Sequence, residues 1–309
     1  MNILIVGTGV IGTLYGYALS KKHQVSHFVR KEKMDILNGK EIIYDIIDER
    51  EGKNHQNTNG TYRYRCVTEA NDSYDLIIVP VKTFQLEDVL HILIQQAPDA
   101  KYLLFTLDWN FSNELDNILN TNKYIMGYAG GGGTFKKNLL WANIGNDIML
   151  GEVHPEQDAL LSSTTELFKS CGIIAEISKN PLHWLWIHNV GSAPLGVALA
   201  KYRDMSQLLN DKTLVKTAFR AMRECYKICE KRGVDLKQYS EVKMFKIPIC
   251  IIYPIFKLNF TKNPIMQRYT AHAVDSIDEM AANFKEIYNT GSSLGVEMPN
   301  MRALMKIIN

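Results

Sequence analysis

The N-terminal segment MNILIVGTGVIG restricts the fold more than any other, because it joins an apolar run to three closely spaced glycines. Residues 2–6 have the character of a buried strand, and residues 11–19 carry a helical apolar pattern. Between strand and helix, Gly7 would allow the sharp turn, Gly9 the approach of a pyrophosphate, and Gly12 close helix packing. A tight turn that binds nothing is the alternative. We predict that the dinucleotide is bound by Gly7, Thr8, Gly9, Val10, Ile11 and Gly12.

Apolar segments that alternate with helical patterns indicate a parallel sheet. Strands are predicted at residues 24–29, 40–47, 62–67, 74–81, 102–107, 124–127, 142–150 and 173–177. Helices are predicted between them at residues 85–96 and 157–170. The polar, asparagine-rich segment at residues 49–60 is interpreted as a hairpin connection on the surface. The pattern predicts an α/β fold with a doubly wound, mainly parallel sheet.

From Pro181 onward only helical periodicity remains, interrupted by prolines. Because 309 residues exceed the usual size of a single core, we predict two domains. Residues 1–180 would bind the nucleotide, and residues 181–309 would form an all-α domain for substrate binding or dimerisation. The apolar stretch at residues 247–260 is interpreted as a buried, kinked core segment; a pocket lining or a subunit contact is the alternative.

The balance of charges narrows the class of partner. The 35 Lys and Arg residues nearly equal the 33 Asp and Glu residues, so we expect neither a nucleic-acid nor a membrane partner. Five cysteines without C-x-x-C spacing predict no disulfide framework and no metal site. The chain enters an apolar strand without a basic segment or a small-residue cleavage site, which predicts a cytoplasmic protein without a signal peptide.

The residues after the second predicted strand indicate which dinucleotide is bound. An NAD enzyme would carry Asp or Glu there to bind the ribose hydroxyls, whereas this chain has Arg30 and Lys31. A guanidinium and an ammonium suit a 2′-phosphate, so NADP is the predicted cofactor. Lys82, at the end of YDLIIVPVK, is expected beside the cofactor or the substrate. The alternative is that all three are solvated surface charges.

The glycine turn, the basic pair, the segment PVKTFQ at residues 80–85 and the helical second half together resemble the ketopantoate reductase (2-dehydropantoate 2-reductase) family. Residues 278–300 are similar to that family's glutamate, helix and Gly-Val-x-x-Pro pattern. The resemblance implies a Rossmann domain, a helical domain, and NADPH-dependent reduction of a small 2-keto acid in pantothenate biosynthesis. A homodimer is one expected assembly.

The resemblance assigns roles to individual residues. It carries Glu279 to the family's active-site glutamate, although a solvated carboxylate is the alternative. It carries Lys82 to cofactor or substrate binding, together with the glycines and Arg30.

The family's proton-donating lysine has no match. The family pattern W-x-K-x-x-x-N-x-x-x-N-P-L corresponds to HWLWIHNVGSAPL at residues 183–195. Aligning on Trp184 puts Trp186 at the lysine position, and aligning on Asn189 puts Leu185 there. Because reduction of a ketone creates an alkoxide, the site needs a proton or a cation that neither side chain supplies.

Two further positions depart from the family. Leu107 replaces an expected asparagine in TLDWN at residues 106–110, and PIMQRY at residues 264–269 lacks a serine ahead of the glutamate.

Two histidines and an amide are candidates for the missing function. His183 and Asn189 share the helical face of Trp186, whereas His188 points aside. A histidine titrates in the useful range, although a packed core histidine is the alternative. We therefore predict His183, His188 and Asn189 as catalytic residues alongside Glu279.

Three functions fit these observations. The first is an NADP-dependent reductase of a small 2-keto acid or a related carbonyl or imine compound. The second is a catalytically weakened NADP(H)-binding sensor or interaction protein of the same fold. The third is a true ketopantoate reductase with displaced catalytic groups, which would have to function despite the missing lysine, asparagine and serine.

Overall fold

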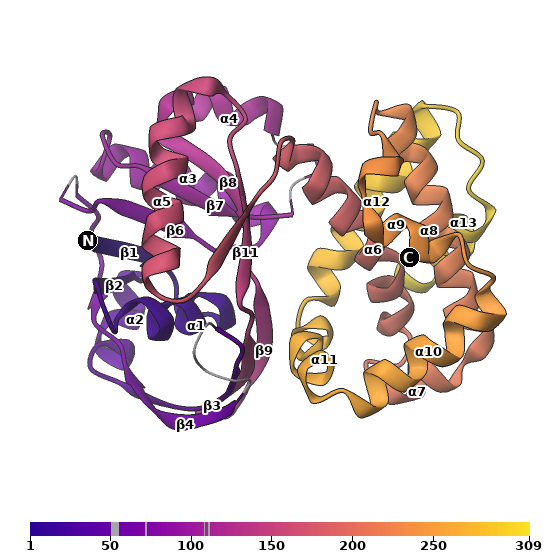
Figure 1. Cartoon of the computed structure of the whole chain (residues 1–309), viewed down its shortest axis with the longest axis horizontal. Coiled ribbons are helices and arrows are strands. Elements are labelled where there is room, and N and C mark those ends of the chain that lie inside the picture. Colours follow the sequence, from indigo (N-terminus) through magenta and orange to yellow (C-terminus); the bar gives the residue numbers. More distant parts are fainter. Residues whose placement is uncertain (51–55, 72, 108, 111) are drawn as a thin grey trace. The chain divides into compact units, whose positions relative to one another are not determined.

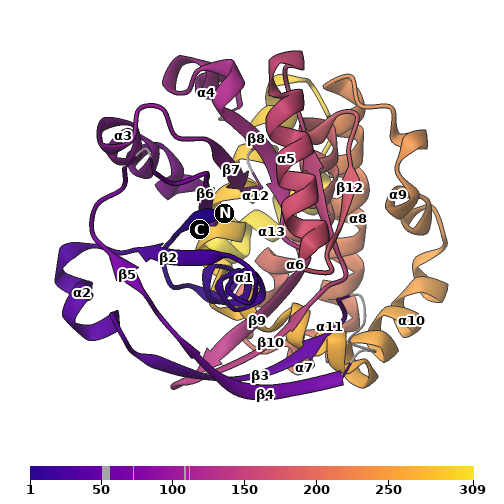
Figure 2. The same cartoon turned by 60° about the vertical axis from the view of Figure 1, so that its left-hand side comes forward.

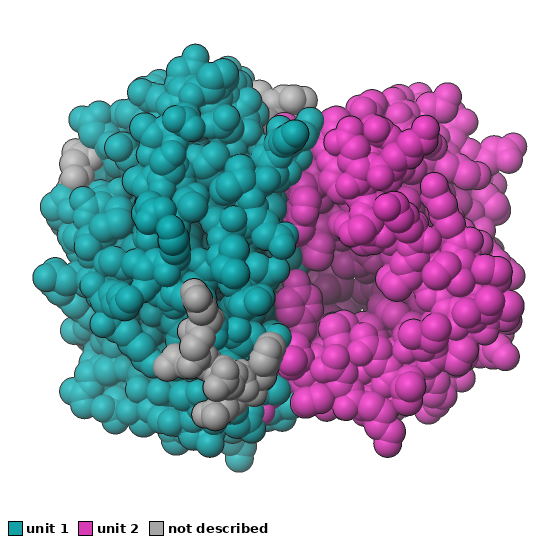
Figure 3. Space-filling view, viewed as in Figure 1, with its two compact units in different colours: residues 1–106, 111–181 teal, residues 107–110, 182–309 magenta. Residues whose placement is uncertain are grey.

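The computed structural model describes the chain except residues 51–55, 72, 108 and 111 (Figure 1). The chain divides into two compact units, coloured separately in Figure 3. Unit 1 comprises residues 1–106 and 111–181, and unit 2 comprises residues 107–110 and 182–309. The middle of the predicted hairpin connection and Asp108 of the TLDWN segment lie outside the described residues.

Unit 1 is built on an eight-stranded sheet. In spatial order its strands are β12 (Ile174–Ile177), β11 (Asp147–Gly151), β8 (Tyr124–Tyr128), β7 (Tyr102–Phe105), β6 (Leu76–Val79), β1 (Asn2–Val6), β2 (Gln24–Phe28) and β5 (Cys66–Val67). Every neighbouring pair is parallel except β8 with β11. The carboxyl ends of β1, β2, β6 and β7 therefore lie along one edge of the sheet.

Helices cover both faces of this sheet. They are α1 (Val10–Leu19), α2 (Lys31–Leu37), α3 (Leu86–Gln96), α4 (Ser112–Ile118) and α5 (Asp158–Ser170). Side chains of α1 and α5 share one core cluster with Ile3, Ile78 and Leu103 of the strands. Figure 2 shows α3 and α5 on opposite sides of β6, β7 and β8. This arrangement is the doubly wound α/β sheet that the alternating pattern predicts.

A second, four-stranded sheet belongs to the same unit and was not predicted. Its order is β4 (Gln56–Arg63), β3 (Glu41–Asp48), β10 (Leu139–Ile144) and β9 (Gly131–Lys136). The polar segment expected to be a loop supplies much of β4, where Asn57, Asn59 and Thr61 alternate outward. Thr58 and Gly60, which face inward, lack a large apolar side chain, so the sequence shows no alternation of apolar and polar residues here. The single strand predicted at residues 142–150 is two strands in different sheets.

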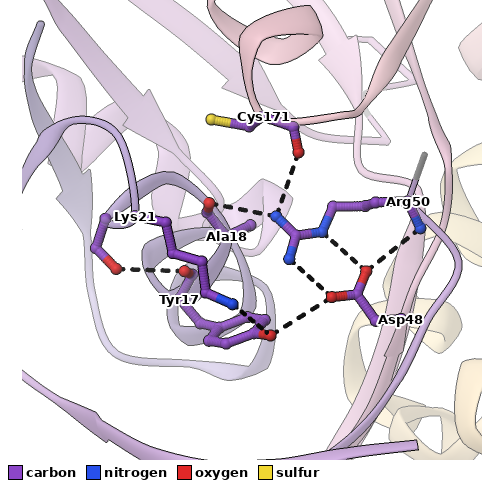
Figure 4. A network of polar contacts seen from close by, with 7 residues as sticks. Tyr17, Ala18, Lys21, Asp48, Arg50 and Cys171 are labelled. Carbon is purple, nitrogen blue, oxygen red and sulfur yellow. Dashed lines mark hydrogen bonds and ion pairs between the residues drawn. The ribbon is translucent and has the colours of Figure 1, made fainter. Parts of the chain in front are cut away.

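Strand β3 ends at a buried ion pair between Asp48, its last residue, and Arg50 (Figure 4). Arg50 donates from Nε and Nη2 to the carboxylate of Asp48, at 2.9 and 2.7 Å, and neither side chain is more than 3% exposed. Its Nη1 also donates to the carbonyl oxygens of Ala18 and Cys171, at 3.3 and 3.4 Å. Because the last carbonyls of a helix lack intrahelical partners, the guanidinium joins the C-terminal ends of α1 and α5 to the small sheet.

The described part of unit 2 contains helices and their connections. The helices are α6 (Pro181–Ala200), α7 (Met205–Asn210), α8 (Lys212–Lys231), α9 (Ser240–Phe245), α10 (Ile249–Lys262), α11 (Pro264–Tyr269), α12 (Ile277–Ser293) and α13 (Pro299–Ile308). Short 3₁₀ turns occur in both units, at Thr83–Gln85, Thr121–Lys123, Pro155–Gln157, Leu236–Gln238 and Ala271–Val274. Phe219, Met222 and Ile228 of α8 are at most 1% exposed in the core of unit 2. The predicted pairing of an α/β fold with an all-α second part is confirmed.

The interpretation of residues 247–260 as a buried core segment is wrong. Within α10 only Ile252 and Phe260 are buried, whereas Ile251, Ile255 and Leu258 are 52%, 61% and 60% exposed. An amphipathic pattern is absent because both faces of this helix are apolar, and the unit's core covers only one of them. Among the described residues, no helix is both long and apolar enough to cross a membrane.

Candidate nucleotide-binding site

The turn between β1 and α1 has a separate structural reason for each glycine. Gly7 has a φ of +84°, and its N–H donates to the carbonyl of Phe28 at 2.9 Å. A Cβ at Gly9 would meet no atom within 4 Å, whereas a Cβ at Gly12 would lie 2.8 Å from the carbonyl oxygen of Gly7. Gly7 therefore makes the turn, Gly9 leaves space above it, and Gly12 lets the helix pack closely.

The N-terminus of α1 has the properties of an anion site. Its N-cap residue is Gly9, which offers no side chain to bond the first backbone N–H groups. The first N–H to reach an intrahelical carbonyl is that of Thr13, which donates to Gly9 at 2.8 Å. The N–H groups of Val10, Ile11 and Gly12 therefore point out of the helix end, where the helix dipole also favours negative charge. These residues fit a pyrophosphate.

The basic pair lies at the carboxyl end of β2, beside the glycine turn. Arg30 is the N-cap of α2, a helix that was not predicted, and Lys31 is its first residue. The side chain of Arg30 is 80% exposed, and its Nε lies 3.6 Å from a carboxylate oxygen of Glu32. Phe28, which holds Gly7 through its carbonyl, is only two residues away. Both cations are thus exposed on the edge of the sheet that carries the turn.

Lys82 does not end a strand as expected, because β6 ends at Val79. It is instead the N-cap of the short 3₁₀ turn Thr83–Gln85, and its Nζ lies 5.6 Å from the centroid of the Phe84 ring. The hydroxyl oxygens of Thr83 and Thr106 are 3.4 Å apart, which ties this segment to the end of β7. Lys82 therefore still follows the carboxyl edge of the parallel strands.

In unit 2, the position expected to hold a lysine is part of a stack of aromatic rings and a cation. Trp186 is 9% exposed, and its ring centroid lies 5.3 Å from that of His183. The guanidinium carbon of Arg232 lies 3.5 Å from the Trp186 centroid and 4.3 Å from that of Trp109. Arg232 Nη1 also donates to the carbonyl of Trp109 at 3.1 Å.

Arg232 and Trp109 were missed by sequence reasoning. Arg232 follows α8 and Trp109 lies in the segment after β7, so no local spacing connects either residue to Trp186. The other candidate for the lysine position, Leu185, is fully buried. In the sequence, Trp109 is marked only as a tryptophan in TLDWN, and Arg232 only as an arginine before the glycine that follows a helix.

The other predicted catalytic residues of α6 are engaged within unit 2. The ring of His188 stacks on Trp184 with centroids 5.0 Å apart and an interplanar angle of 6°. Asn189 is 1% exposed and donates from Nδ2 to the carbonyl of Leu107 at 3.0 Å. The segment that departs from the family at Leu107 thus uses its backbone, rather than a side chain, to bind α6.

The surroundings of both histidines lower the pKa and so favour the neutral imidazole. Burial lowers the pKa of His188 to about 4. Burial, and then the positive charge of Arg232, lower the pKa of His183 below its ordinary value of 6.5. A neutral imidazole is a weak proton donor, so these environments oppose the acid role predicted for either residue at neutral pH.

Glu279 lies on a different helix from these residues. It belongs to the first turn of α12 together with Asp278, and it is half-buried. A carboxylate is favourable at this end of a helix because of the helix dipole.

Together the doubly wound sheet, the glycine turn after its first strand and the helical second part define a Rossmann-type α/β fold with an α-helical C-terminal unit. Residues 3–137 match the family described as "Ketopantoate reductase PanE/ApbA". This match confirms the predicted resemblance to ketopantoate reductases over residues 3–137, and it supports the prediction of a reductase whose substrate is open. No curated protein sequence matches the chain.

Several solved structures share the fold over the full chain. A 2-dehydropantoate 2-reductase from Geobacter metallireducens GS-15 is 19% identical, with 100% of this chain and 99% of that chain covered and a TM-score of 0.75. A dimeric ketopantoate reductase from Staphylococcus aureus is 14% identical, with 100% and 97% covered and a TM-score of 0.68. A D-mandelate dehydrogenase with NADH and anilino(oxo)acetate is 16% identical, with 100% and 97% covered and a TM-score of 0.72.

Proposed function

We propose that the protein is an NADP-dependent oxidoreductase that reduces a small 2-keto acid or a related carbonyl or imine compound. The observation that carries the proposal is the glycine turn, which leaves space above Gly9 and directs free N–H groups out of the end of α1. The turn would hold the pyrophosphate, and Arg30 and Lys31 would pair with the 2′-phosphate. When bound, the dinucleotide supplies the hydride.

The proposed preference for NADP depends on the two exposed cations. A 2′-phosphate offers charge-assisted contacts to both, whereas a 2′-hydroxyl offers neither of them an anionic partner. The mandelate dehydrogenase structure contains NADH, so a likeness of fold does not decide between the two cofactors.

We propose a catalytic arrangement in which Arg232 replaces part of the function of the missing lysine. Its guanidinium contacts Trp186, the residue at the lysine position, and it stays protonated at every relevant pH. A fixed cation stabilises the negative charge that develops on the carbonyl oxygen, but it does not release a proton. The proton would come from His183, and Glu279 would keep the active-site role that the resemblance implies. His188 and Asn189, which contact Trp184 and the carbonyl of Leu107, would support α6.

The pKa of His183 makes this arrangement testable through pH. Because its pKa is lowered, the proton-donating form becomes populated only as the pH falls below 6.5, so reduction should be slow at pH 7 and faster at pH 5.5. Consumption of NADPH should be followed with a panel of 2-keto acids, ketopantoate included, between pH 5.5 and 8. We expect neutral-pH turnover roughly 10²–10⁴-fold below that of an enzyme with a lysine acid.

A flat pH profile with a neutral-pH kcat of roughly 1–10³ s⁻¹ would contradict this arrangement. The matched variant is His183→Gln, which removes the titrating imidazole but keeps a polar side chain. It should abolish the increase in the rate of reduction at low pH. A lysine at residue 186 is a poor rescue test, because its ammonium would face the guanidinium of Arg232.

An NADP(H)-binding sensor or interaction protein is the second candidate. It is favoured by Trp186, since an aromatic stack fills the position of the expected acid. Tight NADPH binding without turnover on any compound of the panel would support it.

We also propose a homodimer that covers the exposed residues Ile251, Ile255 and Leu258 of α10. We further propose a cytoplasmic location. A role in pantothenate biosynthesis would follow from turnover of ketopantoate.

A further inference from the structure

Two consecutive carbonyl groups of the glycine turn are held by buried side chains. His27 of β2 is fully buried, and its Nδ1 lies 2.9 Å from the carbonyl oxygen of Gly7. Thr13 of α1 is 1% exposed, and its hydroxyl donates to the carbonyl oxygen of Thr8 at 3.2 Å. Neither residue belongs to the glycine motif, and both reach the turn from beneath it.

A tyrosine from the small sheet stands behind each of these side chains. The hydroxyl of Tyr62, on β4, lies 2.8 Å from His27 Nε2. The hydroxyl of Tyr64, just beyond β4, lies 2.6 Å from Thr13 Oγ1. Both tyrosines are buried, and their rings meet edge to face with centroids 5.6 Å apart. The small sheet is thereby connected to the glycine turn through two short chains of hydrogen bonds.

The direction of each hydrogen bond follows from chemistry. A carbonyl oxygen only accepts, so His27 carries its proton on Nδ1 and its Nε2 must accept from Tyr62. The hydroxyl of Thr13 donates its only proton to the carbonyl oxygen of Thr8, so its oxygen must accept the hydrogen bond from the Tyr64 hydroxyl. Burial lowers the pKa of His27 to about 4 and raises that of Tyr64 to about 12, which keeps both groups in these neutral forms.

Gly16 is a glycine outside the nucleotide motif that these contacts explain. A Cβ at Gly16 would lie 2.6 Å from His27 Nε2 and 2.6 Å from the Tyr62 hydroxyl. The helix therefore lacks a side chain where the histidine and tyrosine meet.

We propose that Tyr62 with His27, and Tyr64 with Thr13, are positioning pairs that set the nucleotide affinity of the turn. A peptide unit is planar, so holding the carbonyls of Gly7 and Thr8 beneath the turn directs the N–H groups of Thr8 and Gly9 to the opposite side. A turn with glycine on both sides of Thr8 is otherwise free to rotate these peptides and to present a carbonyl oxygen to the phosphates. This inference rests on the proposed nucleotide binding.

The test compares three tyrosine-to-phenylalanine variants by titration with NADPH and with adenosine 2′-monophosphate, which has no pyrophosphate. Tyr62→Phe and Tyr64→Phe should each weaken NADPH binding by about three- to tenfold, and together by tens of fold, because each removes one buried hydrogen bond behind the turn. Affinity for adenosine 2′-monophosphate should stay unchanged. The matched control is Tyr44→Phe, because Tyr44 is on the same sheet but its ring lies against Tyr17, with centroids 4.6 Å apart, and not against the turn.

Two results would overturn the inference. One is a folded double variant that binds NADPH as the wild type does; the other is an equal loss of affinity for both ligands, which indicates general damage to the unit. Failure of the proposed function is distinguishable from both, because the wild-type protein would then not bind NADPH at all.

Discussion

Gly9 and Gly12 stand three residues apart, but a side chain would meet a different obstacle at each. Gly9 has an ordinary φ of −68° and open space around its Cβ position, so Gly9→Val should fold as the wild type does. The valine would occupy the space of the pyrophosphate and weaken NADPH binding more than tenfold. Gly12→Ala places a Cβ against the Gly7 carbonyl and should lower the melting temperature as well. Thermal melts combined with NADPH titration check both variants, and a folded Gly9→Val protein with wild-type affinity would remove the turn from the site.

Residues differ in how far the sequence predicts their roles. The glycine turn is predictable because its three requirements arise within one strand–turn–helix unit. The contact of Arg232 with Trp186, and that of Tyr62 with His27, join distant parts of the chain, so no spacing rule finds them. The lowered pKa of His183 is likewise set by burial and by Arg232, neither of which a single sequence displays.

At the scale of elements, the buried pair of Asp48 and Arg50 connects β3 to two helices (Figure 4). Arg50→Met should destabilise the protein by about 3–5 kcal/mol, because the carboxylate of Asp48 is then buried without its partner. The double variant Asp48→Leu with Arg50→Met should recover a large part of the loss, since no unpaired charge remains. Urea unfolding measures both. A single variant within about 0.5 kcal/mol of the wild type would show that the pair does not tie these elements together.

The predictability of elements follows the strength of their apolar patterns. Buried strands such as β1 and β8 have apolar sequences, and the residues at which they begin were predicted correctly. Strand β4 was missed because its outward residues are polar and its inward residues Thr58 and Gly60 are small, so that only Tyr62 near its end signals a strand. Helix α10 was misplaced because both of its faces are apolar. Neither property reveals which neighbour a segment packs against.

At the scale of the whole molecule, the order of strands and helices predicts the architecture well but predicts the activity poorly. Alternating strands and helices followed by helices alone predict the α/β and α-helical parts, and the family match over residues 3–137 covers the glycine turn, the basic pair and Lys82. The fold does not determine the reaction, because structural neighbours with this fold are named for different substrates. The missing lysine makes the reaction of this chain harder still to infer from its fold. Cofactor binding is therefore the level at which the account is tested most directly.

The decisive measurement is the fluorescence titration of the wild-type protein and of the Arg30→Ala, Lys31→Ala double variant with NADPH and NADH. We predict that the wild type binds NADPH at least tenfold more tightly, a difference of about 1.4 kcal/mol that one charge-assisted contact can supply. The double variant should lose this preference while its affinity for NADH stays unchanged, because the glycine turn is intact. Equal affinities in the wild type, or tighter binding of NADH, would contradict the assignment of NADP and show that Arg30 and Lys31 are only surface charges.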